Sequence, residues 1–212
     1  MKRIILVATL MTSLVFLNGC FCPLTSVNPL SDPQDAKYDK RLGGAWQSVS
    51  QDGDLEFVHF GKGDEKKTEM IIIEHMRSGK IDFSTLTVFP TIINGKGYLN
   101  IHVEDLFEEF SEDLSGYVFM KYELLDKNTL TLSFLKEKPI IEAIKSGKLE
   151  GEITYEKKGI KKDDEGDSSK QNKKKTIKCV ILSDSSDNIL KYIQSVDPDK
   201  LFPEPIELKR IK

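Results

Sequence analysis

The sequence is poor in cysteine and tryptophan. Its 212 residues include three cysteines, Cys20, Cys22 and Cys179, and one tryptophan. No two cysteines have the C-x-x-C spacing of zinc sites and redox motifs, so no metal centre of that kind is predicted. Three cysteines are also too few for a disulfide framework. In an oxidising compartment Cys22 and Cys179 can form one disulfide, and a free, buried Cys179 is the alternative.

Signatures of the common enzyme classes are also absent. The sequence contains no G-x-S-x-G turn, no H-E-x-x-H helix and no phosphate-binding G-x-x-x-x-G-K-[ST] loop. Its three histidines, His59, His75 and His102, fall on three different predicted strands, which leaves few ways to assemble a catalytic or metal-binding group. His59 shares a predicted strand face with Leu55 and Phe57, so we interpret it as a partly buried histidine. We therefore predict a protein that is not an enzyme and holds no metal or cofactor.

An excess of positive charge is missing. The chain has 31 Lys and Arg against 34 Asp and Glu, a net charge of −3. Domains that bind nucleic acid carry a basic face, so no nucleic-acid partner is expected. Six acids crowd into residues 104–113, where they can meet a cation or a basic partner, or form the solvated face of an amphipathic helix. They are Glu104, Asp105, Glu108, Glu109, Glu112 and Asp113.

The N-terminal apolar run lacks the length of a membrane span. A helix needs about 20 apolar residues to cross a bilayer, and this run covers only residues 4–17. It follows Lys2 and Arg3 and ends at Asn18 and Gly19, which is the three-part layout of a secretory signal peptide. We predict that residues 1–19 are removed. The net charge then falls from −3 to −5, because two basic residues and no acid are lost.

Leu17-Asn18-Gly19-Cys20 resembles the bacterial lipobox, in which a leucine stands three positions before a cysteine. The resemblance implies cleavage between Gly19 and Cys20 and attachment of diacylglyceryl and further acyl chains, such as palmitate, to Cys20. Two or three chains anchor a protein stably, whereas one binds only marginally. The protein is then expected in the bacterial cell envelope. Phe21 after the cysteine favours the outer over the inner membrane, by resemblance to enteric lipoproteins. An ordinary signal peptide and a retained anchor are the alternatives.

The remaining chain divides into a tether and one domain. Residues 20–40 hold three prolines among polar residues without an apolar period, which predicts a flexible tether. From residue 41 to residue 212, short runs rich in β-branched and aromatic residues alternate with turn residues, as in an antiparallel sheet. Asn94-Gly95 is suited to a tight hairpin turn. Pro90 confines its strand to an edge or a bulge.

We predict a mainly β domain of the α+β class, an antiparallel barrel or strongly curved sheet of about nine strands. Three peripheral helices are predicted at residues 104–114, 139–146 and 185–196. The uninterrupted apolar run at residues 70–73 is expected to be a strand covered on both faces. Residues 158–174 mix lysines and acids and can bury little apolar area, which predicts a mobile loop.

Gly44-Ala45-Trp46 opens the first predicted strand and resembles the G-x-W motif of lipocalins and related calycin barrels. In that family the tryptophan plugs the closed end of the barrel, and a basic residue of the last strand covers it. The resemblance implies that Arg210, or Lys209, covers Trp46. Such a cation-π contact contributes about 0.5–2 kcal/mol. The Thr-Asp-Tyr motif of lipocalins is missing, and an ordinary core role for Trp46 is the alternative.

More of the chain is similar to a set of uncharacterised bacterial lipoproteins. The similarity rests on Asn28-Pro29-Leu30-Ser31, on Tyr38-Asp39-x-Arg41-Leu42-x-Gly44-x-Trp46 and on Asp197-x-Asp199-x-Leu201-Phe202. It spans most of the mature chain and implies no established activity.

The sequence therefore predicts a membrane-anchored envelope lipoprotein with three candidate functions. The first is a non-catalytic, lipocalin-like module for a small apolar ligand, since a barrel of about eight strands can hold one. The second is a structural or interaction protein that holds an envelope partner through edge strands or the acidic helix. The third is an envelope hydrolase or another enzyme, which a gathering of Glu74, His75, His102 or Glu104 in one apolar cleft would favour.

Overall fold

The structure is a computed structural model that describes residues 24–49, 54–63, 67–76, 78–106, 115–155 and 177–211. The predicted signal peptide, the lipidation site at Gly19 and Cys20, and the charged loop at 158–174 lie outside these residues. In the part of the chain that is described, no helix has the length and apolar character needed to cross a bilayer.

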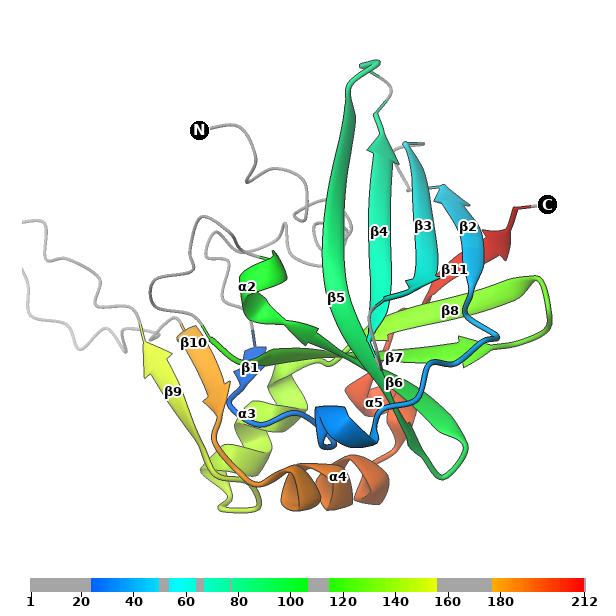
Figure 1. Ribbon diagram of the computed structural model, residues 1–212. Helices are drawn as coiled ribbons and strands as arrows, with labels where there is room; N and C mark the ends of the chain where they lie inside the picture. The colour runs from blue at the N-terminus through cyan, green and yellow to red at the C-terminus, as the bar shows by residue number, and fades with distance from the viewer. Residues whose placement is uncertain are drawn as a thin grey trace, which may run out of the picture.

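Eight strands form a closed antiparallel barrel (Figure 1). Seven of them follow one another around the ring in chain order, and the last strand of the chain, β11, closes the ring between β8 and β2. The strands are β2 (Gly44–Val49), β3 (Leu55–Lys62), β4 (Thr68–His75), β5 (Ile81–Ile93), β6 (Lys96–His102), β7 (Tyr117–Leu124), β8 (Thr129–Phe134) and β11 (Ile206–Arg210). The prediction of a mainly β barrel is confirmed.

Local sequence explains two features of the barrel. Asn94 and Gly95 have φ values of 51° and 78°, the left-handed pair that a two-residue hairpin between β5 and β6 requires. Pro90 has no N–H to donate, and it lies beyond the end of the β4–β5 ladder at Val88, where β5 pairs with β6 alone. Both positions agree with the sequence-based expectation.

A core of large apolar side chains lies inside the barrel. Strand residues alternate between the inside and the outside, so every second residue points into this core. The largest members, each less than 2% exposed, are Trp46, Phe60, Met70, Leu86, Leu99, Ile101, Met120, Leu130 and Leu132. Trp46 and Phe60 lie toward one end of the barrel, which we call the closed end. The β4–β5 hairpin marks the opposite end, which we call the mouth.

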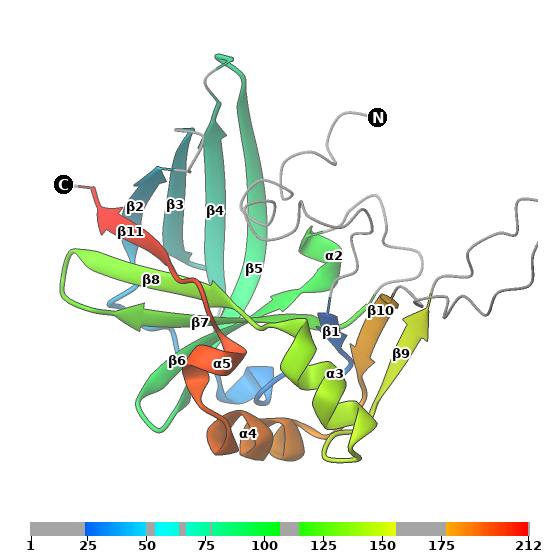
Figure 2. The ribbon, with the colours of Figure 1, turned by 180° about the vertical axis from the view of Figure 1, so that it is seen from behind.

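A side layer packs against the outside of β5, β6 and β7 (Figure 2). Most of it is inserted between β8 and β11. Its elements are β1 (Leu24–Ser26), α3 (Glu137–Lys145), β9 (Gly151–Tyr155), β10 (Ile177–Leu182), α4 (Ser186–Ser195) and α5 (Pro198–Leu201). Two of its helices, α3 and α4, match the predicted ranges closely. The predicted helix at 104–114 is described only as far as α2 (Val103–Leu106).

The predicted tether is wrong for residues 24–40, because this segment packs against the fold. β1 pairs with β10 and β7. Leu30 is fully buried, and its N–H donates to the Asn100 side chain at 2.7 Å. The Asn28 amide donates to the Asp184 carbonyl at 2.9 Å. A short 3-10 helix follows at Pro33–Asp35. Single anchoring residues hold the segment, so it shows no apolar period.

Candidate functional site

Trp46 and Arg210 meet at the closed end of the barrel. They are cross-strand partners in the β2–β11 ladder, and the Arg210 guanidinium carbon lies 4.0 Å from the centroid of the Trp46 ring. Trp46 is fully buried, and its indole N–H donates to the Leu42 carbonyl at 2.7 Å. The predicted pair is therefore brought together. Lys209 instead bonds Thr129 and Glu207.

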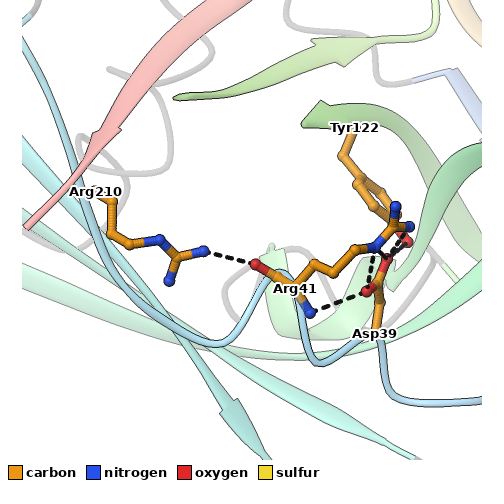
Figure 3. A network of polar contacts seen from close by, with 4 residues as sticks. All are labelled: Asp39, Arg41, Tyr122 and Arg210. Carbon is orange, nitrogen blue, oxygen red and sulfur yellow. Dashed lines mark hydrogen bonds and ion pairs between the residues drawn. The ribbon is translucent and has the colours of Figure 1, made fainter. Parts of the chain in front are cut away.

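Arg210 also fastens the chain segment that enters β2. Its guanidinium donates to the carbonyls of Gly43 at 2.6 Å, Arg41 at 2.7 Å and Lys127 at 2.8 Å; the Arg41 contact is visible in Figure 3. Gly44 adopts a φ of 113°, and a Cβ there would lie 3.0 Å from the Arg210 Nη1 atom. Glycine at this position is thus required by both the backbone and the arginine.

A second polar network lies beside this arginine (Figure 3). Asp39 accepts hydrogen bonds from the Arg41 guanidinium at 2.7 Å and from the Tyr122 hydroxyl at 2.9 Å. Burial alone would raise the pKa of Asp39, but these bonds outweigh it and hold the pKa below its usual value. Burial and the Asp39 charge raise the pKa of Tyr122 far above its usual value. The polar groups at the closed end are therefore paired with one another and hold the fold together. The mouth is the other end of the barrel, and we consider it as the candidate site.

Four polar side chains form one cross-strand row inside the mouth. The ladders place Ser48 beside Glu56, Glu56 beside Glu74, and Glu74 beside Asp82. Glu56 and Glu74 are only 4% and 2% exposed. The Ser48 hydroxyl donates to the Glu56 carboxylate at 2.9 Å. The row thus sets two buried carboxylates at one end of an apolar interior.

Burial controls the chemistry of this row. Loss of solvent raises the pKa of Glu56 above its usual value; the Ser48 hydrogen bond opposes this effect, and the charge of Asp54 adds to it. A buried carboxylate is stabilised by a cation or by hydrogen-bond donors. Asp82, nearer the rim, already pairs with Lys80 at 2.6 Å. The row therefore places, at this end of the barrel, buried acidic groups that a cation or a hydrogen-bond donor would stabilise.

Sequence reasoning missed the mouth because it assigned the wrong face of β3. Leu55, Phe57 and His59 point outward, and His59 is exposed, so its predicted partial burial is wrong. The inward set alternates from Glu56 through Val58 to Phe60. Both faces of the strand carry apolar residues, and the alternation alone therefore did not decide between them.

The three histidines do not converge. His59 and His75 lie exposed on the outer faces of β3 and β4, whereas the side chain of Glu74 points inward. His102, on β6, lies 3.7 Å from the Glu104 carboxylate, and its ring is tilted by 49° against that of Tyr117 with 4.7 Å between the ring centroids. Within the described ranges, no group of three or more His, Cys, Asp or Glu residues is placed to hold a metal ion.

The other predicted site residues are only partly described. Cys179 lies half-buried on β10. Its predicted disulfide partner, Cys22, lies outside the described residues, and that pairing stays a prediction. Of the acidic cluster, Glu104 and Asp105 belong to α2, and the Asp105 carboxylate accepts the Thr87 N–H at 2.8 Å. The other four acids lie outside the described residues.

The fold and the mouth define a class of architecture: a closed, eight-stranded, up-and-down antiparallel barrel with one end locked and buried carboxylates at the other. No family model, no curated protein and no solved structure matches this chain.

Proposed function

We propose that this protein is a bacterial envelope lipoprotein whose barrel is a non-catalytic, lipocalin-like binding module for a small ligand. The supporting observation is the row of Ser48, Glu56 and Glu74 buried at one end of a largely apolar interior. Ligand sites are typically apolar pockets with a few convergent polar groups, and barrel mouths are common places for them. Trp46 and Arg210 cover the closed end, so the ligand is proposed to enter at the mouth.

The proposed ligand has an apolar body and an amine or another hydrogen-bond-donating end. The body would extend toward the next inward cross-strand row, which consists of Trp46, Val58, Ile72 and Ser84. The donating end would meet Glu56. A carboxylate ligand is disfavoured here, because it would add a negative charge beside the carboxyl groups of Glu56 and Glu74.

Binding can be tested on residues 20–212 carrying Cys20→Ser, so that no lipid is attached. The neutral dye N-phenyl-1-naphthylamine would be displaced with dodecylamine and, separately, with dodecanoate. We expect dodecylamine to bind at least about tenfold more tightly, the ratio that one charge-assisted hydrogen bond supplies. The preference should shrink as the pH falls through the raised pKa of Glu56, because the protonated carboxyl no longer attracts a cation.

Two matched variants distinguish binding at the polar row from a nonspecific effect of the protein's negative charge. Glu56→Gln should remove most of the preference for the amine, whereas Glu69→Gln, exposed on the outer face of β4, should leave it unchanged. Native mass spectrometry of the gently purified protein supplies an independent measurement. Failure of both amphiphiles and the dye to bind, together with a ligand-free mass, would contradict the proposed function.

The lipid anchor has a geometric consequence. The described fold begins at Leu24, so only residues 20–23 separate the proposed lipid on Cys20 from β1. Four residues span at most about 14 Å. The barrel is therefore proposed to lie directly against the membrane surface rather than on a long tether.

Replacing Cys20 with serine is expected to release the protein from membranes, because the thiol that carries the acyl chains is gone. Fractionation of cells expressing the parent and Cys20→Ser measures the partition, and the intact mass of the parent reports acylation. A parent mass that still includes residues 1–19, or equal partition of the two proteins, would disprove lipidation at this cysteine.

A further inference from the structure

The outer face of β2–β5 carries a surface without charge. Three adjacent cross-strand rows, which we call the uncharged face, supply twelve side chains to it. They are Val49, Leu55, His75 and Ile81; Gln47, Phe57, Ile73 and Phe83; and Ala45, His59, Ile71 and Thr85. None is Asp, Glu, Lys or Arg, although these four types make up 31% of the chain.

The uncharged face is open to solvent in the described structure. Phe83 is 73% exposed, Val49 63%, Ile81 62% and Ile73 36%. In Figure 1 the strands β2, β3 and β4 face the viewer, and none of the labelled helices lies over them. Large exposed apolar patches of this kind usually mark interaction surfaces.

The same face corrects a sequence-based expectation. The run at residues 70–73 was expected to be covered on both faces. Met70 and Ile72 are buried inside the barrel, but Ile71 and Ile73 point outward, and Ile73 is exposed. The outer face of an antiparallel sheet is usually polar when it meets water. The apolar composition of the outer face of β2–β5 indicates that another surface, outside the described fold, packs against it.

We propose that the uncharged face is the interface of a homodimer, in which a second copy of this chain supplies the cover. A twofold axis would set the same three rows against one another, so neither copy buries an unpaired charge. Anionic lipid headgroups would be met by lysine or arginine, and these rows contain neither. A partner recognised by charge has nothing to pair with here.

The size of the uncharged face limits the affinity expected for the proposed dimer. Four strands spaced about 4.8 Å apart, with rows about 6.8 Å apart, give a footprint of roughly 20 Å by 20 Å. Side-chain relief increases the accessible area above this flat value. Two such footprints bury roughly 800 Å² before that relief is added, which is at the lower limit for a specific interface, so a weak and reversible dimer is expected. Phe57, Ile73 and Phe83 form the apolar middle row, where truncation should cost most.

Sedimentation velocity of residues 20–212 carrying Cys20→Ser, over a concentration series, tests the dimer. We expect a reversible shift from monomer to dimer. Ile81→Lys and Phe83→Lys should each raise the dissociation constant at least about tenfold, because each places a charge in the apolar contact. Ile92→Lys is the matched control: it is the same change on the same strand, at a position 53% exposed and outside the face. It should leave the dissociation constant unchanged.

Three outcomes would overturn the proposal. The first is a parent that remains monomeric at all concentrations up to the hundreds of micromolar. The second is an equal effect of Ile92→Lys and Ile81→Lys on association. The third is a monomeric parent that co-sediments with phosphatidylcholine vesicles and loses this binding with Phe83→Lys, which would assign the face to a lipid surface. Ligand binding at the mouth is measured separately, so failure of the dimer leaves the proposed function standing.

Discussion

Trp46→Ala is expected to lower the free energy of unfolding by about 3–5 kcal/mol, the range measured when a fully buried aromatic residue is cut back to alanine. Trp46 is 0% exposed and touches both the barrel core and the Arg210 guanidinium. Its loss leaves a cavity at the closed end and removes the ring beneath a cation. Urea unfolding followed by circular dichroism measures the change, since the variant has no tryptophan fluorescence.

Two companion variants divide this effect into its parts. Trp46→Phe keeps an aromatic ring but loses the hydrogen bond to Leu42, and it should cost less than Trp46→Ala. Arg210→Lys keeps the charge but cannot bond three carbonyls at once, so it should also destabilise the fold. If Trp46→Ala and Trp46→Ala with Arg210→Lys unfold alike, the two residues act as a unit. A change below about 1 kcal/mol in Trp46→Ala would refute the locked closed end.

Leu30→Ala is expected to cost about 2–5 kcal/mol, although the residue stands in a proline-rich segment that resembles a linker. Leu30 is completely buried in the side layer, and its N–H donates to the buried Asn100 side chain. The truncation should also raise amide hydrogen exchange in residues 24–32. Denaturant unfolding and exchange with mass detection provide the two measurements.

Val27→Ala is the matched control for this prediction. Val27 lies three residues earlier in the same segment but is 55% exposed. Its truncation should change stability by no more than about 0.5 kcal/mol, as is usual for surface positions. Equal effects of the two variants would show that the segment is not anchored as described.

The sequence contained enough information for a mainly β, barrel-like or strongly curved sheet and for the Trp46–Arg210 pair, whereas closure of the ring comes from the structure. The hairpin pair Asn94-Gly95 and the edge position of Pro90 follow from backbone chemistry alone. The contact between Trp46 and Arg210 followed from a resemblance, because nothing in local spacing relates residues 164 positions apart. The structure supplies the register in which β2 and β11 pair.

The mouth could not be found by alternation. In β3 the outward Leu55 and Phe57 compete with the inward Val58 and Phe60, and the strand reads as apolar on either face. Glu56 and Glu74 then look like ordinary surface acids. If the uncharged face is an interface, both faces of β3 are buried in the dimer. This explains why its sequence is apolar on both faces and why alternation did not decide which one points inward.

The tether failed as a prediction for a different reason. Leu30 is one buried side chain among polar residues, and Asn28 and Ser31 are held by hydrogen bonds to distant segments at 2.9 Å and 2.6 Å. Periodicity methods detect repeated apolar positions. Such methods do not detect a segment that is held in place by single buried or hydrogen-bonded residues.

The position of β11 has a consequence for biogenesis. The ring cannot close until residues 206–210 are available, because β2 and β8 have no other partner on those edges. β11 follows the other seven ring strands in the chain, so export from the N-terminus, as proposed above, would deliver it after them. If the protein is exported as proposed, the facing edges of β2 and β8 would need shielding until β11 arrives. Removal of β11 would leave a domain with two unpaired strand edges, which are templates for aggregation.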